Sequence, residues 1–152
     1  MAPDSISKRE RTESSQGPAA DGHTFVALHR VRSYELDSFG HVNNAVFLNY
    51  LEYARGEFLL QRGLSFADFD RWNAMPFVIK VELTFKSPAK VHDLLEIRGS
   101  IPQWRRTSFV IHYQVFNRST NKVSAVADMA FAFVNKEEKL VPIPQEFLKA
   151  LS

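Results

Sequence analysis

Hydrophobic and polar residues repeat with different periods in the two halves of the chain. Over residues 43–62 the apolar side chains recur at helical spacing, which predicts a long, largely buried helix with an apolar side formed by Phe47, Tyr50, Leu51, Ala54 and Phe58. Asn43 suits the N-cap of this helix, and Gly63 suits a left-handed residue at its end. Gly56 lies inside the helix, where it lowers helix stability, and it therefore predicts a close backbone contact with a sheet.

The second half of the chain has the two-residue period of β-strands. Apolar residues alternate with polar ones over residues 77–85, which predicts a strand with one face in solvent. Three more strands are expected over residues 95–101, 109–115 and 123–134. The connections between these strands are short enough for antiparallel neighbours, and they cover residues 88–93, 102–106 and 117–122.

Three further segments complete the expected elements. An apolar run over residues 24–34 predicts a strand ahead of the long helix. Ser65, with Asp68 three residues later, predicts the start of a short helix, and residues 144–151 predict one or two final helical turns. The order of strand, long helix and four strands predicts an α+β fold, in which an antiparallel five-stranded sheet wraps around one long buried helix.

The predicted fold has consequences for domains and assembly. Residues 23–152 are expected to form a single domain, whereas residues 1–22 are rich in Ser, Gly and Pro with few large apolar side chains, so we expect a disordered tail. Five strands over one helix leave a sheet edge and an outer face to be covered. Pairing of edge strands is the expected solution, and it predicts a homodimer or a dimer of dimers.

Composition removes several classes of function. The 152 residues include no Cys, which excludes disulfides, thiol catalysis and Cys-ligated metals, and the five His lack the spacing of a metal site, so no metal is expected. The 19 Lys and Arg nearly balance the 17 Asp and Glu, and the resulting net charge of +2 argues against a nucleic-acid partner. Apolar runs are too short for a membrane span or a secretion signal, and we expect a cytoplasmic protein.

The densest cluster of candidate catalytic side chains lies where the first strand gives way to the long helix. This cluster comprises Asp37, His41, Asn43 and Asn44. A helix N-terminus offers free N–H groups that polarise a carbonyl, and Asp37 can attack that carbonyl or activate a water. Equally, Asp37 and the two Asn suit a helix cap with an Asx turn, and spacing alone leaves both roles open. Asp128, inside an apolar strand, is a second candidate carboxylate unless it lies on the solvent face.

Two motifs resemble a known family. The string from Tyr34 to Tyr50, YELDSFGHVNNAVFLNY, is similar to the signature of the 4-hydroxybenzoyl-CoA thioesterase family of hotdog-fold proteins. The string from Trp104 to Phe109, WRRTSF, resembles the stretch of those enzymes that binds coenzyme A phosphates. The resemblance implies a hotdog fold and hydrolysis of an acyl-CoA thioester to a carboxylic acid and coenzyme A, with no metal or cofactor.

The resemblance also implies roles for individual residues. Asp37 falls on the catalytic aspartate, which acts as nucleophile or general base, and the backbone N–H near Asn44 falls on the group that polarises the thioester carbonyl. His41 matches relatives that act on aliphatic acyl-CoA, where it would hold Asp37 or a water, or close the loop. The phosphate-binding motif falls on Arg105, Arg106 and Thr107, with Thr107 in place of a lysine; in the family this motif often acts across a subunit boundary.

The same residues also allow other functions. The chain could bind acyl-CoA without cleaving it, or act as a hotdog hydratase or dehydratase with Asp37 and His41 as its dyad. The string His-Val-Asn-Asn also occurs in plant acyl-carrier-protein thioesterases, but those resemble a pattern with Asn two places after the Asp, where this chain has Phe39. The predicted partner is therefore acyl-CoA.

Overall fold

The computed structural model describes residues 23–152, and the predicted disordered tail, residues 1–22, lies outside the described residues. Five strands form one antiparallel sheet in the order β1-β3-β4-β5-β2. The strands are β1 (Thr24–Arg30), β2 (Met75–Phe85), β3 (Leu94–Trp104), β4 (Ser108–Asn117) and β5 (Lys122–Val134). The helices are the short 3-10 helix η1 (Ser33–Glu35), α2 (Asn44–Gln61), α3 (Phe66–Trp72) and α4 (Gln145–Leu151). These elements confirm the predicted α+β class and its five-stranded sheet.

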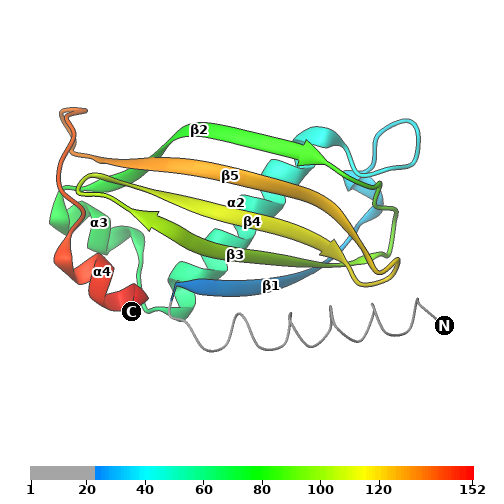
Figure 1. Cartoon of the computed structure of the whole chain (residues 1–152), viewed down its shortest axis with the longest axis horizontal. Coiled ribbons are helices and arrows are strands. Elements are labelled where there is room, and N and C mark those ends of the chain that lie inside the picture. Colours follow the sequence, from blue (N-terminus) through cyan, green and yellow to red (C-terminus); the bar gives the residue numbers. More distant parts are fainter. Residues whose placement is uncertain (1–22) are drawn as a thin grey trace.

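The long helix α2 lies across one face of the sheet (Figure 1). It begins where predicted, because the side-chain oxygen of Asn43 accepts a hydrogen bond from the N–H of Ala45 at 2.9 Å, and Gly63 follows its end with a left-handed φ of 72°. Its buried side chains are those of Phe47, Tyr50, Leu51, Ala54 and Phe58. No helix among residues 23–152 is long and apolar enough to cross a membrane.

The prediction for Gly56 is wrong. Gly56 is exposed, and a Cβ at this position would meet no atom within 4 Å. The glycine that permits a close contact is Gly99 of β3, because a Cβ there would overlap the ring of Phe25. That ring stacks on Phe58 of α2, with centroids 4.5 Å apart. Gly99 therefore makes room for an aromatic stack between the helix and the sheet.

Two predicted element boundaries are also wrong. The first strand ends at Arg30 rather than at residue 34, because the carboxylate of Glu35 accepts a hydrogen bond from the N–H of Arg32 at 2.8 Å and turns the chain into η1. The connection expected over residues 102–106 is shorter, because β3 continues to Trp104. A register shift between Ser100 and Gln103 lets the strand continue past Pro102, which cannot donate a ladder hydrogen bond.

The strand β2 differs most from its prediction. Alternation predicts that Phe77, Ile79, Val81, Leu83 and Phe85 face a core. Leu83 does pack against the core, but in the single chain the exposed fractions of the other four side chains are 50%, 62%, 38% and 47%. One physical reason is the position of β2 at the sheet edge, where only β5 pairs with it. A second reason is the register shift between Val78 and Lys80, which interrupts the alternation, so that Phe77, opposite Ala132, lies on the other face of the sheet from Val81, opposite Met129. Phe85 contacts the ring of Phe47 of α2, whereas Val78, Ile79 and Val81 remain exposed along the β2 edge within one chain.

Candidate active site

A tight loop presents Asp37 ahead of the N-terminus of α2. We call residues 36–42 the Asp37 loop. The N–H of Asp37 donates to the carbonyl of His41 at 2.7 Å, and the N–H of Gly40 donates to the carbonyl of Asp37 at 3.1 Å. Gly40 has a φ of 82°, which glycine adopts without strain, and an isolated bridge joins Leu36 to Val42. The loop is therefore closed by its own backbone.

The two carboxylate oxygens of Asp37 have different surroundings. Oδ1 accepts hydrogen bonds from the N–H groups of Phe39 at 2.9 Å and of His41 at 3.2 Å. Oδ2 accepts no hydrogen bond from any residue of the range 23–152. Asp37 itself is half-buried. The arrangement fixes the carboxylate through one oxygen and leaves the other oxygen able to react.

The first turn of α2 provides a free hydrogen-bond donor. Asn43 accepts hydrogen bonds from Ala45 through its side chain and from the N–H of Val46 through its carbonyl at 2.9 Å. The N–H of Asn44 has no acceptor within the described part of the chain, and the Asn44 side chain is exposed. An N–H at this end of a helix carries the positive end of the helix dipole, so it can polarise a carbonyl oxygen placed beside it.

His41 contacts Asp37 through its backbone rather than through its ring. The ring is half-buried and forms no hydrogen bond with any described residue, whereas the His41 N–H and carbonyl both bond to Asp37. The structure therefore does not contain the Asp37–His41 dyad that a hydratase or dehydratase would need. In this structure His41 closes the loop.

Arg105, Arg106 and Thr107 form the turn between β3 and β4. The N–H of Arg105 donates to the carbonyl of Ser108 at 2.8 Å, and the carbonyls of Arg106 and Thr107 accept from Ile143 at 2.9 Å and Phe133 at 2.8 Å. The side chains of both arginines are exposed. The turn is thus held firmly by its backbone while its two positive charges extend into solvent, as binding of phosphate groups requires.

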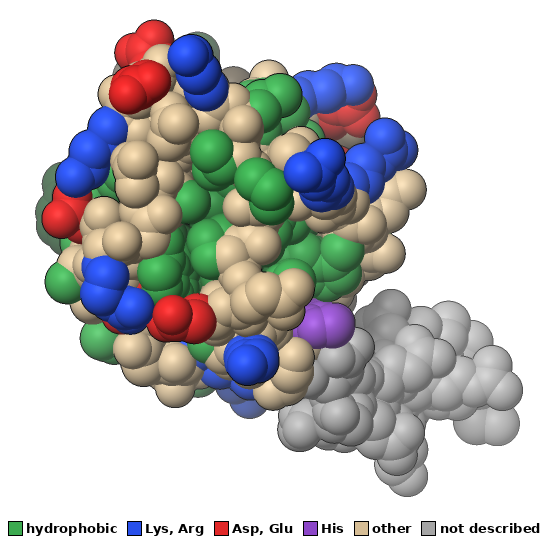
Figure 2. Space-filling view, turned by 90° about the vertical axis from the view of Figure 1, so that its left-hand side faces the viewer, with side chains coloured by type: hydrophobic (Ala, Val, Ile, Leu, Met, Phe, Trp, Pro, Cys, Tyr) green, Lys and Arg blue, Asp and Glu red, His purple; other side chains and the backbone are tan. Residues whose placement is uncertain are grey.

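This arginine turn belongs to the end of the molecule that carries α3 and α4 (Figure 1). Figure 2 faces this end and shows hydrophobic side chains at its centre, with Lys, Arg, Asp and Glu around the rim. Trp104 stacks on Phe109 with centroids 5.2 Å apart, and both rings contact Phe147 of α4. The aromatic contacts hold the turn against α4.

One copy of the chain does not bring the arginine turn to Asp37. The Asp37 loop is bonded to the segment just before β3, because the N–H of Val42 donates to the carbonyl of Ala89 at 2.8 Å. The arginine turn follows the other end of β3, which has 11 residues. At about 3.3 Å per residue, the two sites lie about 30 Å apart. They occupy opposite ends of the sheet (Figure 1).

Asp128 does not belong to the candidate site. Its carboxylate lies 2.7 Å from Nδ1 of His112, and the two side chains are 55% and 49% exposed. Its strand neighbours Ala127 and Met129 are buried, so Asp128 lies on the sheet face that points away from α2. The solvent-face alternative is correct.

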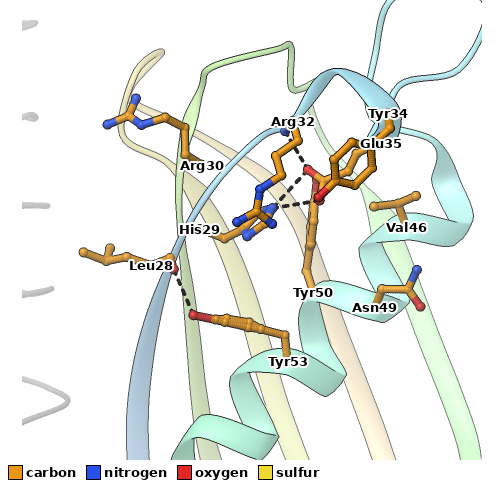
Figure 3. Close-up of a pocket in the computed structure, with 10 residues that line it drawn as sticks. All are labelled: Leu28, His29, Arg30, Arg32, Tyr34, Glu35, Val46, Asn49, Tyr50 and Tyr53. Carbon is orange, nitrogen blue, oxygen red and sulfur yellow. Dashed lines mark hydrogen bonds and ion pairs between the residues drawn. The ribbon is translucent and has the colours of Figure 1, made fainter.

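Sequence reasoning missed a partly buried polar cluster next to the Asp37 loop. A cavity of about 590 Å³ opens between the β1 edge and α2, and Figure 3 shows Glu35 at its inner side. The Glu35 carboxylate accepts hydrogen bonds from Nε2 of His29 at 2.9 Å, the N–H of Arg32 at 2.8 Å and the hydroxyl of Tyr50 at 3.0 Å. We call these four residues the Glu35 cluster. Period alone assigned Tyr50 to the apolar core, and no local signal links it to an acid 15 residues earlier.

Comparison with known proteins gives concordant results. A family model described as the thioesterase-like superfamily matches residues 31–151. The long-chain acyl-CoA thioesterase FadM of Escherichia coli is 29% identical over 127 residues, which cover 80% of this chain and 92% of FadM. The acyl-CoA thioesterase YbgC of Helicobacter pylori is 30% identical over 138 residues, which cover 81% of this chain and 96% of YbgC.

A solved structure extends the comparison to the fold. The 4-hydroxybenzoyl-CoA thioesterase from a Pseudomonas species superposes with a TM-score of 0.76 at 19% identity, covering 84% of this chain and 99% of that one. This likeness concerns the fold and confirms the predicted hotdog architecture. The family match and the named relatives confirm the resemblance that the two sequence motifs indicated.

Proposed function

The chain belongs to the thioesterase-like superfamily, and we propose that it is an acyl-CoA thioesterase with Asp37 as its catalytic carboxylate. The proposal depends on one observation above all. Asp37 Oδ2 has no partner among the described residues, and it lies in the loop that leads directly into the first turn of α2. A reactive carboxylate and a polarising N–H group thus occur within eight residues of chain.

The reaction divides between these two groups. The thioester carbonyl oxygen accepts a hydrogen bond from the Asn44 N–H, which stabilises the negative charge that develops on that oxygen. Asp37 Oδ2 either attacks the carbonyl carbon, forming an anhydride that water then hydrolyses, or removes a proton from a water that attacks it. In both cases the C–S bond breaks, coenzyme A leaves as a thiolate that takes up a proton, and the acyl group leaves as a carboxylate.

The proposed active unit is a dimer. Antiparallel pairing of β2 with β2 of a second copy would cover the exposed apolar side chains of Val78, Ile79 and Val81 along the open edge. The two-fold axis of such a pair places the α3 and α4 end of one copy beside the Asp37 loop of the other. Arg105 and Arg106 of the second copy would then bind the phosphates of an acyl-CoA whose thioester lies near Asp37, since one copy holds these groups at opposite ends.

The test is release of free thiol from a panel of short, long and aromatic acyl-CoAs. We expect hydrolysis of at least one class and a loss of about 100-fold or more in kcat for Asp37→Asn, because this change removes the carboxylate charge. Asp128→Asn is the matched control and should retain the parental rate, since Asp128 lies on the opposite face of the sheet.

Two results would refute the proposal. Binding of acyl-CoA without thiol release from any substrate would identify a binding module instead. Hydrolysis by Asp37→Asn at the parental rate would show that another group performs the chemistry.

A further inference from the structure

The Glu35 cluster joins three separate segments of the chain. The carboxylate accepts hydrogen bonds from His29 at the end of β1, from the backbone of Arg32 before η1 and from Tyr50 on the second turn of α2. Figure 3 shows these groups converging on Glu35. Glu35 is only 8% exposed and Tyr50 only 3%, so the hydrogen bonds replace contacts with water. A single carboxylate therefore fixes the helix relative to the strand.

The charge state of the cluster suits a structural anchor. Burial disfavours the ionised form of Glu35, but the hydrogen bonds from Arg32, His29 and Tyr50 outweigh it and hold the pKa of this carboxyl below its usual range. Burial, together with the neighbouring Glu35 charge, raises the pKa of Tyr50, which therefore remains a neutral donor. A carboxylate that already accepts this many hydrogen bonds is poorly available as a base, so Glu35 acts through other groups.

The backbone of Glu35 extends the anchor to the proposed catalytic groups. Its carbonyl accepts a hydrogen bond from the N–H of Asn43 at 3.0 Å, and Asn43 is the N-cap of α2. The Asp37 loop leaves the anchor directly after Glu35 and returns to it at Asn43. This hydrogen bond closes the short segment from Glu35 to Asn43. Asp37 lies within the closed segment, and the free N–H of Asn44 follows directly after it.

We propose that Glu35 is a positioning residue that sets the placement of Asp37 relative to the first turn of α2. This inference rests on the function proposed above. Hydrolysis requires the carboxylate and the polarising N–H to meet one thioester carbonyl, and a misplacement of about 1 Å can lower a rate by about 100-fold. Side-chain bonds from Glu35 prevent such a displacement because they hold β1, η1 and α2 at the point where the loop begins.

Two variants test the inference with little change in shape. Glu35→Gln removes the charge that strengthens all three hydrogen bonds, and Tyr50→Phe removes one donor while keeping the buried ring. Tyr53→Phe is the matched control, because the Tyr53 hydroxyl lies in the same cavity but donates to the carbonyl of Leu28 at 3.4 Å, outside the Glu35 cluster. All assays are run well below the measured melting temperature of each variant.

The first measurement separates kcat from KM on the best acyl-CoA substrate. We expect Glu35→Gln to lower kcat about 10-fold and Tyr50→Phe to lower it about 3-fold, with KM within 2-fold of the parent, since neither residue belongs to the proposed phosphate site. Tyr53→Phe should leave both constants within 2-fold. Unchanged kcat for Glu35→Gln would overturn the inference, as would an equal loss in Tyr53→Phe.

The second measurement does not require activity. Hydrogen exchange of the peptide covering residues 36–43 should become at least about 5-fold faster in Glu35→Gln, while exchange in β4 stays at the parental rate. Unchanged exchange in that peptide would overturn the inference even with an active parent enzyme. An inactive parent, or an Asp37→Asn variant with full activity, would instead refute the proposed function, so the two failures are distinguishable.

Discussion

The two edges of the sheet differ in the contacts that the rest of the chain makes with them. At the β1 edge, Tyr53 of α2 donates a hydrogen bond to the open carbonyl of Leu28, and the Glu35 cluster ties the strand to the helix. At the β2 edge, apolar side chains such as Ile79 remain exposed. A single chain thus completes one flank of its helix with polar contacts and leaves the other flank exposed, which is where we propose that a second copy pairs.

The largest expected effect comes from placing a charge on the open edge. We expect Ile79→Lys to shift the molecular mass measured by light scattering from a dimer to the 17.4 kDa single chain. Acyl-CoA hydrolysis should fall by about 100-fold or more, because Asp37 and the arginine turn then no longer meet. Leu28→Lys on the β1 edge is the control and should leave mass and rate unchanged, since Leu28 is already 48% exposed. An Ile79→Lys variant that is still dimeric and active would refute the proposed pairing of two copies along β2.

A smaller effect is expected from removing the polar anchor of the β1 edge. Glu35→Ala should lower the free energy of unfolding at pH 7 by about 2–3 kcal/mol, because it leaves buried donors without an acceptor. Asp128→Ala removes a carboxylate with a similar His partner, but this pair is exposed on the outer face, so the cost should be about 0–1 kcal/mol. Urea unfolding at one fixed protein concentration measures both, and equal losses would contradict the role assigned to burial.

The stability that Glu35 contributes depends on pH. Because the folded-state pKa of Glu35 lies below its usual value of 4.5, its contribution to stability is complete above the unfolded-state pKa and is lost as pH falls through the folded-state pKa. Glu35→Gln should therefore weaken the acid dependence of the unfolding free energy by up to one proton, and Tyr50→Phe should weaken it by less. Unfolding curves between pH 7 and pH 3 provide the measurement; an unchanged slope in Glu35→Gln would count against the pKa shift.

The smallest effect on stability is expected from a substitution at Gly56, on the exposed side of α2. Gly56 points away from the sheet into open space, so Gly56→Ala should raise the unfolding free energy by about 0.5–1 kcal/mol through helix propensity alone. The thermal midpoint measured by circular dichroism should rise accordingly. A lower midpoint would mean that a second copy packs directly against this side of α2, and the proposed dimer would then need a different geometry.

Two errors of the sequence-based prediction share one cause. The segment 31–34 looks like strand by composition, yet Glu35 turns it into η1 through a hydrogen bond to Arg32. Gly56 looked like a contact residue, whereas Gly99 makes the contact because Phe25 lies over it. In each case the deciding contact joins a residue to a partner outside its own segment, so the pattern of that segment carries no information about it.

The sequence by itself determined the elements and the location of the candidate chemistry. The helix with its cap at Asn43, the alternating strands and the position of Asp37 at a strand-to-helix junction all depend on residues a few places apart. Local spacing specifies such features because a helix turn and a strand pleat each repeat within four residues.

Only the tertiary structure decided the strand order, the open β2 edge, the Glu35 cluster and the separation of the arginine turn from Asp37. These features depend on contacts between residues far apart in the chain, as when β2 pairs with β5 although β3 and β4 lie between them in the sequence. Such contacts are selected by the packing of the whole core, because burying apolar surface and satisfying buried polar groups are properties of the complete fold.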